Sequence, residues 1–108
     1  MVLMEFSVVP LGSGVSISPY VARCVEIVEQ SGLDHRLHAM GTVVEGELVQ
    51  VLALLQQCLE AVAADCERVT CSAKFDYRRG QQGCIESKVR SVEEKLGRRS
   101  KSAAAQTG

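Results

Sequence analysis

Tryptophan is absent from this chain of 108 residues, and only four residues are phenylalanine or tyrosine. With 46% of the residues hydrophobic, the core must therefore be built mainly from aliphatic side chains. The chain also lacks an apolar stretch long enough to cross a membrane. Its apolar start, Met1 to Pro10, is short, is interrupted by Glu5 and has no basic segment, so we expect no signal peptide. These absences predict a cytoplasmic protein without a membrane partner.

An excess of basic charge is missing as well. The net charge is -1, and three of the 12 basic residues, Arg98, Arg99 and Lys101, lie in an acid-free stretch at residues 98–108. Residues 1–97 therefore hold 9 basic and 13 acidic residues, a net charge of about -4. A nucleic-acid binder needs a basic face for the phosphates, so we expect no such partner. We expect a single domain over residues 1–97 and a disordered basic tail over 98–108.

The five cysteines include no CxxC pair, and their number is odd. In a chain without secretory features, this pattern argues against a disulfide framework. Cys24, Cys58 and Cys71 fall at apolar positions of periodic segments, where a free cysteine acts as a small hydrophobic residue. Cys84 follows Gly83 near an expected helix start and is a candidate reactive thiol, but no histidine stands at a suggestive position beside it.

Other motifs for chemistry are incomplete. The segment Leu11 to Val15 contains GxG but not the rest of a phosphate-binding fingerprint, so we interpret it as a strand-to-helix connection. His35 and His38 are three residues apart in an expected strand, so they point to opposite faces and make a poor metal site. We expect no catalytic residue, no metal and no cofactor.

The order of expected elements predicts an α+β protein. Residues 3–10 alternate like a strand, and Ser18 and Pro19 are typical of a helix start whose end is Gly32. Strands at 35–40 and 42–47, joined at Gly41, form a hairpin before the amphipathic helix 48–62. A strand at 69–78 and a helix at 85–96 follow. The order β-α-β-β-α-β plus a C-terminal helix matches a ferredoxin-like sandwich, with a four-stranded antiparallel sheet and its helices on one face.

The strand at 69–78 divides into two rows, because side chains in a strand alternate between faces. Its apolar row should face the core together with Phe6, and Phe75 should point towards the helices. In this topology we expect the first and last strands to be central neighbours. Glu5 and Ser7 then share the open face with a polar platform, which is either a solvated surface or the floor of a ligand site. The apolar row is Val69, Cys71, Ala73, Phe75 and Tyr77, and the polar row is Thr70, Ser72, Lys74, Asp76 and Arg78.

Three charged residues are candidates for ligand contacts. Glu45 is either a solvated carboxylate at a strand end or an acceptor for a cationic or amino-bearing ligand. Lys74 and Asp76 lie about 7 Å apart on one face by the strand rise. Either they take part in a structural ion pair with Glu5, in which Lys74 is the cation, or they orient a heteroaromatic ring. The bare face, which also holds apolar Leu3, predicts a homo-oligomer that pairs sheet to sheet.

Several segments together resemble the small thiamine-binding protein family, which is related to the YkoF proteins. The resemblance covers nearly all of residues 3–97 and departs at Gly80 to Cys84, after the last strand. The segments that carry it are Glu5 to Gly12, Ser18 to Val21, Met40 to Gly46, Arg68 to Arg79 and Lys88 to Glu93.

The resemblance implies a ferredoxin-like fold, assembly into dimers or dimers of dimers, and non-catalytic binding of thiamine or its hydroxymethylpyrimidine part. Glu45 and Asp76 would then supply acceptors. Thr42, Ser7 and Lys74 would form a polar frame, and Met40 and Tyr77 an apolar or stacking wall. Two alternatives stay open: a structural or regulatory oligomerisation module, and an enzyme that uses Lys74 or Cys84.

Overall fold

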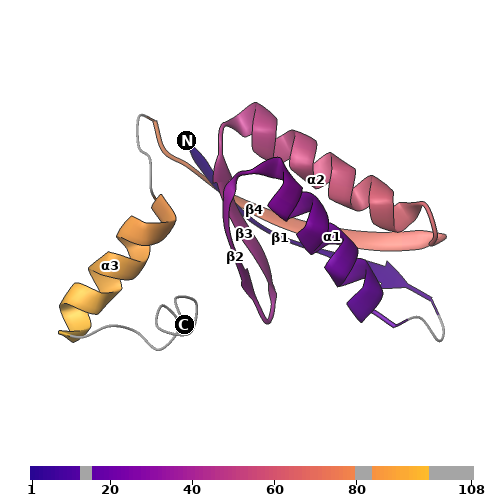
Figure 1. Cartoon of the computed structure of the whole chain (residues 1–108), viewed down its shortest axis with the longest axis horizontal. Helices are drawn as coiled ribbons and strands as arrows, with labels where there is room; N and C mark the ends of the chain where they lie inside the picture. The colour runs from indigo at the N-terminus through magenta and orange to yellow at the C-terminus, as the bar shows by residue number, and fades with distance from the viewer. Residues whose placement is uncertain (13–15, 80–83, 98–108) are drawn as a thin grey trace.

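A computed structural model describes residues 1–12, 16–79 and 84–97 of the chain. The predicted tail and most of the loops at 11–15 and 80–83 lie outside the described residues. Figure 1 shows the arrangement of the elements. In chain order these are β1 (Val2–Leu11), α1 (Ser18–Ser31), β2 (Asp34–His38), β3 (Gly41–Gly46), α2 (Leu48–Ala63), β4 (Arg68–Tyr77) and α3 (Cys84–Leu96).

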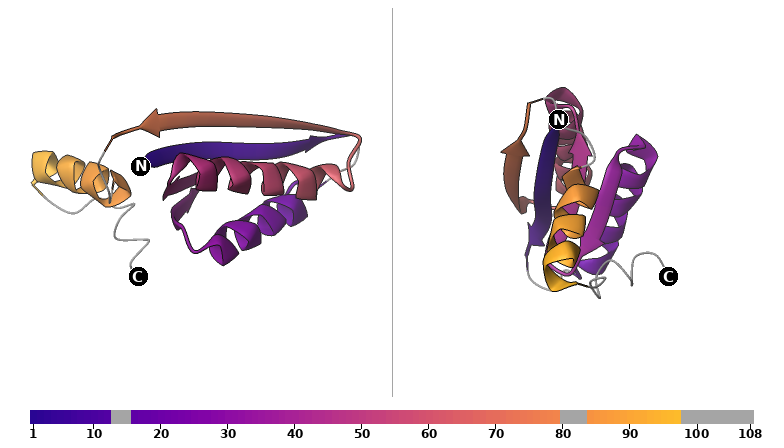
Figure 2. Two further views of the ribbon diagram at one scale, coloured as in Figure 1. Left: turned by 90° about the horizontal axis from the view of Figure 1, so that it is seen from above. Right: turned by 90° about the vertical axis from the view of Figure 1, so that its left-hand side faces the viewer.

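The four strands form one antiparallel sheet in the order β2-β3-β1-β4. Helices α1 and α2 cover one face of it (Figure 2). The predicted α+β, ferredoxin-like sandwich is confirmed. One detail of the prediction is wrong: β4 does neighbour β1, but it is an edge strand. The second neighbour of β1 is β3, so β1 and β3 are the central strands.

The core lies between the sheet and the two covering helices, and it is largely aliphatic as the composition predicts. Alternate residues of β1 face the helices, because successive side chains of a strand point to opposite sides. Phe6 is the one aromatic residue among the described buried positions. The main cluster comprises Val2, Met4, Phe6, Val8, Cys24, Val28, Val44, Val51, Leu54, Cys58 and Val62.

The helix ends follow local signals that the sequence shows. Helix α1 begins at Ser18 itself, so the residue before it, Ile17, occupies the N-cap position where Ser18 was expected. The helix ends as predicted at Gly32, whose φ of 75° is the left-handed conformation that glycine adopts most easily. Helix α2 begins with a capping box: Gln50 Oε1 accepts from the Glu47 N–H at 2.9 Å, and the Glu47 side chain accepts from the Gln50 N–H.

Helix α3 leads away from the sheet, as both views show (Figures 1 and 2). Its first turn is attached to the open face, where Ile85 is buried against Leu3 with Val43 packed beside them. Val92 and Leu96, farther along the helix, are about half exposed. The open face is therefore partly covered at one end of β1 and β3.

Candidate binding site

The register of β1 with β4 places the predicted polar platform on the open face. Glu5 lies opposite Lys74, Ser7 opposite Ser72, and Leu3 opposite Asp76. Directly opposed residues share a face, so Ser7, Lys74 and Asp76 stand on the side away from α1 and α2. The expectation that Glu5 and Ser7 join the polar row is confirmed.

The apolar row of β4 faces the helices over only part of its length. Val69 and Cys71 pack against the main core, but Phe75 is 41% exposed and Tyr77 is 61% exposed. Phe75 lies opposite Met4, on the same face as buried Phe6. Both phenylalanines therefore lie on the helix side, as predicted. The expected burial of the whole row is wrong, because an edge strand at this end of the sheet has little helix above it.

The charges of the open face pair differently from the prediction. Glu5 Oε2 lies 3.2 Å from His38 Nε2, and Asp76 Oδ2 lies 3.4 Å from Arg78 Nε. The expected ion pair between Lys74 and Glu5 is not formed. These groups are exposed enough for solvent to screen them, so the pairs contribute little to stability.

Two shallow hollows lie on the open face. A small one of about 130 Å³ is lined by Glu5, Ser7, Met40 and Lys74 among others. A wider one of about 530 Å³ lies towards the other end of β4, and both are broadly open to solvent. The wider hollow is lined by Leu3, Glu5, Val43, Lys74, Phe75, Asp76 and Tyr77.

Glu45 has a structural partner that the sequence did not reveal. The residue is only 6% exposed, and Oε1 accepts a hydrogen bond of 3.1 Å from the backbone N–H of Ile85. A carboxylate at the first turn of a helix satisfies a backbone donor and interacts favourably with the helix dipole. The interpretation of Glu45 as a solvated strand-end carboxylate is therefore wrong, since this residue holds the start of α3 against the sheet.

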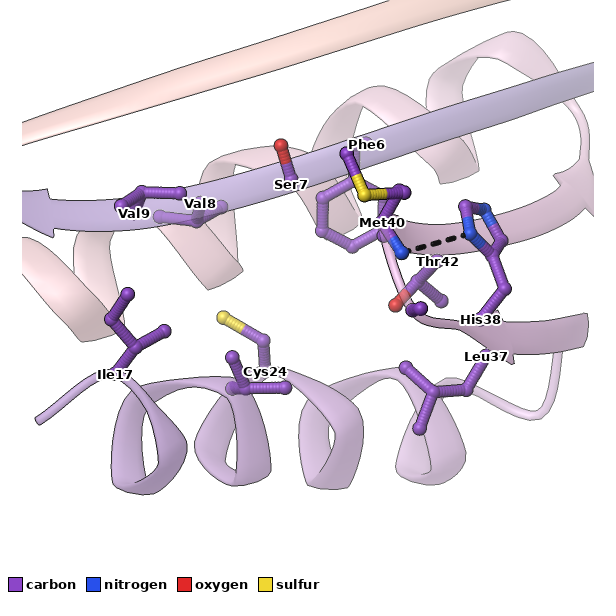
Figure 3. A pocket seen from close by; sticks show the side chains of 13 residues that line it. Phe6, Ser7, Val8, Val9, Ile17, Cys24, Leu37, His38, Met40 and Thr42 are labelled. Atoms are coloured by element: carbon purple, nitrogen blue, oxygen red, sulfur yellow. Dashed lines mark hydrogen bonds between the residues drawn. The ribbon is translucent and has the colours of Figure 1, made fainter.

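A more enclosed pocket lies on the opposite side of the sheet, between β1, the first half of α1 and the β2–β3 turn (Figure 3). Its volume is about 170 Å³, and its walls are mainly apolar. We call it the helix-side pocket. It is lined by Phe6, Ser7, Val8, Val9, Ile17, Val21, Cys24, Leu37, His38, Ala39, Met40, Gly41 and Thr42.

Thr42 is the buried polar residue of this pocket. It lies opposite both Phe6 and Leu37, which puts it on the helix side and away from Lys74. Thr42 and Lys74 therefore do not stand in one frame, although Ser7 and Thr42 both line the pocket. The residue is 8% exposed, and among the described residues no fully buried side-chain oxygen or nitrogen lacks a hydrogen-bond partner. Figure 3 shows the hydroxyl oxygen turned into the pocket.

The β2–β3 turn that forms the mouth of the pocket is fixed by two contacts. The Met40 N–H donates to His38 Nδ1 at 3.2 Å, and His38 Nε2 lies against Glu5. Because Nδ1 accepts, the ring proton belongs on Nε2, the nitrogen that lies 3.2 Å from the Glu5 carboxylate. Gly41 allows the close approach to β1, since a Cβ there would lie 2.7 Å from the Phe6 carbonyl oxygen.

Met40 and Tyr77 do not form one wall. Met40 lies in the turn beyond Thr42, the partner of Phe6, whereas Tyr77 lies opposite Val2. The two are roughly 13 Å apart along β1 by the strand rise. Of the seven predicted site residues, Ser7, Met40 and Thr42 line the helix-side pocket. The contribution of α1 was not predicted, although Val21 and Cys24 carry the apolar periodicity that indicates it.

Metal binding has no support in residues 1–12, 16–79 and 84–97, which contain no cluster of three or more suitable ligands. His35 and His38 point to opposite faces, as predicted, and His35 Nδ1 lies 2.9 Å from the Leu33 carbonyl oxygen. None of the helices in these ranges is both long and apolar enough to span a membrane.

Several relatives resemble this chain over most of its length. The UPF0045 protein sll0230 of Synechocystis sp. is 42% identical over 93 residues, which are 85% of this chain and 77% of that protein. The UPF0045 protein MT1949 of Mycobacterium tuberculosis is 41% identical over 96 residues, 88% of this chain and 94% of its own.

Solved structures show the same fold. The hypothetical protein MJ1052 of Methanocaldococcus jannaschii superposes with a TM-score of 0.78 at 36% identity, over 86% of this chain and 96% of that one. A Thermotoga maritima protein, named as a candidate for thiamine biosynthesis or salvage, has a TM-score of 0.74 over 84% and 97% of the two chains. At 22% identity, the latter shows the fold alone.

Residues 4–93 match the sequence profile of the thiamine-binding proteins. The chain belongs to the thiamine-binding protein family.

Proposed function

We propose that this protein binds thiamine, or its hydroxymethylpyrimidine part, without catalysis, and that it acts in the cytoplasm. The observation that carries the proposal is the Thr42 hydroxyl, which is turned into an apolar pocket of about 170 Å³. The residue as a whole is 8% exposed. A hydroxyl that faces a pocket with mainly apolar walls can donate a hydrogen bond to a ligand or accept one from it. Family membership supports thiamine chemistry for that ligand.

An aminopyrimidine suits the pocket chemically. Its ring faces are apolar and would lie between Val8 on β1 and Val21 on α1, while its edge carries an amino donor and ring-nitrogen acceptors. A threonine hydroxyl can donate to a ring nitrogen or accept from the amino group. Small-molecule sites commonly combine apolar walls with a few such placed polar groups.

The mouth of the pocket suits the rest of thiamine. Met40 is 83% exposed there and its thioether can contact a ring edge. The thiazolium carries a positive charge, and the carboxylate of Glu5 lies beside the turn through its contact with His38. In this arrangement Ser7 and Met40 connect the pocket with the small hollow on the open face.

The ionisable groups that line the pocket support binding rather than reaction. Both ring nitrogens of His38 are engaged, and the Cys24 thiol faces a backbone carbonyl oxygen on α2. The Cys24 thiol and the His38 ring therefore do not form the contact that a nucleophile makes with its base.

Homo-oligomerisation is part of the proposal. Phe75 and Tyr77 stand exposed on the edge strand β4, and the platform of Lys74 and Asp76 lines an open hollow beside them. Two copies that meet through these surfaces would cover both features. The same exposed surfaces support the second candidate function, an oligomerisation module without a small ligand.

Titration calorimetry with hydroxymethylpyrimidine and with thiamine tests the proposal. Thr42→Val keeps the side-chain shape and removes the hydroxyl, so we expect binding to weaken about tenfold. Thr70→Val is the matched control, because Thr70 is exposed on β4 and outside the pocket. Absence of heat with either compound at millimolar concentration would contradict the proposal and leave the oligomerisation module. Binding that depends on Lys74→Ala and not on Thr42→Val would move the site to the open face.

A further inference from the structure

Two cysteines face each other across the contact between α1 and α2. Cys24 Sγ lies 3.9 Å from the Cys58 carbonyl oxygen, and Cys58 Sγ lies 3.8 Å from the Cys24 carbonyl oxygen. Both side chains belong to the main core cluster. Their predicted role as small hydrophobic residues is confirmed by their place in this cluster. The reciprocal contacts add that each thiol sits against the backbone of the other residue, 34 positions away in the chain.

The environment makes the two thiols unequal. A hydrogen bond from Cys58 lowers the pKa of Cys24, and the nearby Arg23 cation acts in the same direction against the effect of burial. The same hydrogen bond and burial raise the pKa of Cys58. Because the thiolate is the reactive form, Cys24 is the residue that an oxidant should attack first.

Access to solvent also favours attack at Cys24 over attack at Cys58. Cys24 lines the helix-side pocket, where Figure 3 shows its sulfur rising from α1 towards β1. Cys58 is fully buried, with 0% of its surface exposed. A small reagent that enters the pocket therefore meets the Cys24 sulfur, whereas Cys58 does not line the pocket. Cys71 is a weaker competitor, since burial raises its pKa.

We propose that Cys24 and Cys58 are a redox-active pair that a small peroxide converts into a disulfide between α1 and α2. The Cys24 thiolate attacks one peroxide oxygen, the O–O bond breaks, and Cys24 becomes a sulfenic acid while hydroxide leaves. The Cys58 thiolate then attacks the Cys24 sulfur, the S–O bond breaks, and water forms with the proton that Cys58 releases. In total, two thiols and one hydrogen peroxide give one disulfide and two waters, and a thiol reductant reverses the change.

The disulfide would join the two covering helices and enclose β2, β3 and their turn in a covalent loop. It would also remove the Cys24 thiol from the floor of the helix-side pocket. The proposal does not depend on which ligand the pocket binds, so it survives if thiamine does not bind.

The test uses the full chain with Cys66→Ser, Cys71→Ser and Cys84→Ser, which leaves Cys24 and Cys58 as the only cysteines. After treatment with hydrogen peroxide and unfolding, we expect the intact mass to fall by two hydrogens and both cysteines to resist alkylation until a reductant is added. Trypsin should yield the peptide 24–36 linked to the peptide 37–68. Cys58→Ser in the same background should stop at the sulfenic acid, which dimedone traps on Cys24.

Oxidised chains in which Cys24 and Cys58 are both still alkylated, or in which Cys24 gains two or three oxygens without a cross-link, would overturn the proposal. A peptide map of the unmodified five-cysteine chain guards against a folding defect in the variants. A peroxide-treated wild-type protein must show the link between Cys24 and Cys58. A different pairing there would overturn the proposal as well.

Discussion

The two sides of the sheet differ at the β2–β3 turn. On the helix side, α1 packs over β1 and leaves a pocket of about 170 Å³, into which the Thr42 hydroxyl is turned. On the open side, the charged residues that the alternation predicts lie in hollows that solvent reaches freely. The comparison shows that a strand can arrange polar groups in a regular row, but that a second layer is needed to enclose a ligand.

The largest difference between the enclosed and the uncovered parts of the sheet should appear in stability. Phe6 is 3% exposed on the helix side, so Phe6→Ala should lower the free energy of unfolding by about 3–5 kcal/mol. Phe75→Ala is the matched control on the same face. Because Phe75 is 41% exposed, its loss should cost about 1 kcal/mol or less. Chemical denaturation measures both, and equal losses would contradict the contrast between the enclosed and uncovered parts of the sheet.

The close contact at Gly41 should be the next most sensitive feature. A methyl group there would meet the Phe6 carbonyl oxygen at 2.7 Å, so the turn must shift away from β1. Gly41→Ala should therefore cost about 1–3 kcal/mol and weaken ligand binding in the pocket. Met40→Ala in the same turn is the stability control, since Met40 is 83% exposed. A Gly41→Ala protein with unchanged unfolding would show that the turn does not depend on this contact.

On the open side, the strongest single effect should come from Glu45. Glu45→Ala leaves the Ile85 N–H without this acceptor, so we expect the start of α3 to be weakened by about 1–2 kcal/mol. Hydrogen exchange at the Ile85 amide measures the change. Glu45→Gln retains an acceptor oxygen and should protect this amide better than alanine does. Equal exchange in all three proteins would remove Glu45 from the attachment of α3.

The smallest effect is expected at the Glu5–His38 pair. Its side chains are 53% and 36% exposed, so solvent screens the interaction. Glu5→Gln should change the free energy of unfolding by less than about 1 kcal/mol, and by less still at high salt. Urea titrations at low and high ionic strength measure this difference. A loss above 2 kcal/mol would show that the open side is more tightly organised than its exposure indicates.

The sequence predicted much of the fold because its local signals agree with one another. The hairpin at Gly41, the end of α1 at Gly32 and the end of α3 at Gly97 are each visible as local patterns and appear in the structure. The facing of Glu5 and Lys74 followed from alternation and topology. Local agreement of this kind is typical of sequences that specify one fold.

The remaining features depend on contacts that no local pattern contains. In β3, Val43 and Val44 are adjacent and both apolar, so the alternation does not say which side Thr42 occupies until the register with Phe6 is known. The burial of Glu45 depends on Ile85, which is 40 residues away. The exposure of Phe75 and Tyr77 depends on how far the helices extend over the edge strand, and β4 itself carries no signal of this.

The central claim is that the ligand enters the helix-side pocket, and a backbone NMR titration with hydroxymethylpyrimidine tests it most directly. We expect the largest shift changes at the amides of Val21, Met40 and Thr42, with Lys74 and Asp76 nearly unchanged. Shift changes centred on Lys74 and Asp76, with Thr42 unmoved, would contradict the claim and place the ligand on the open face.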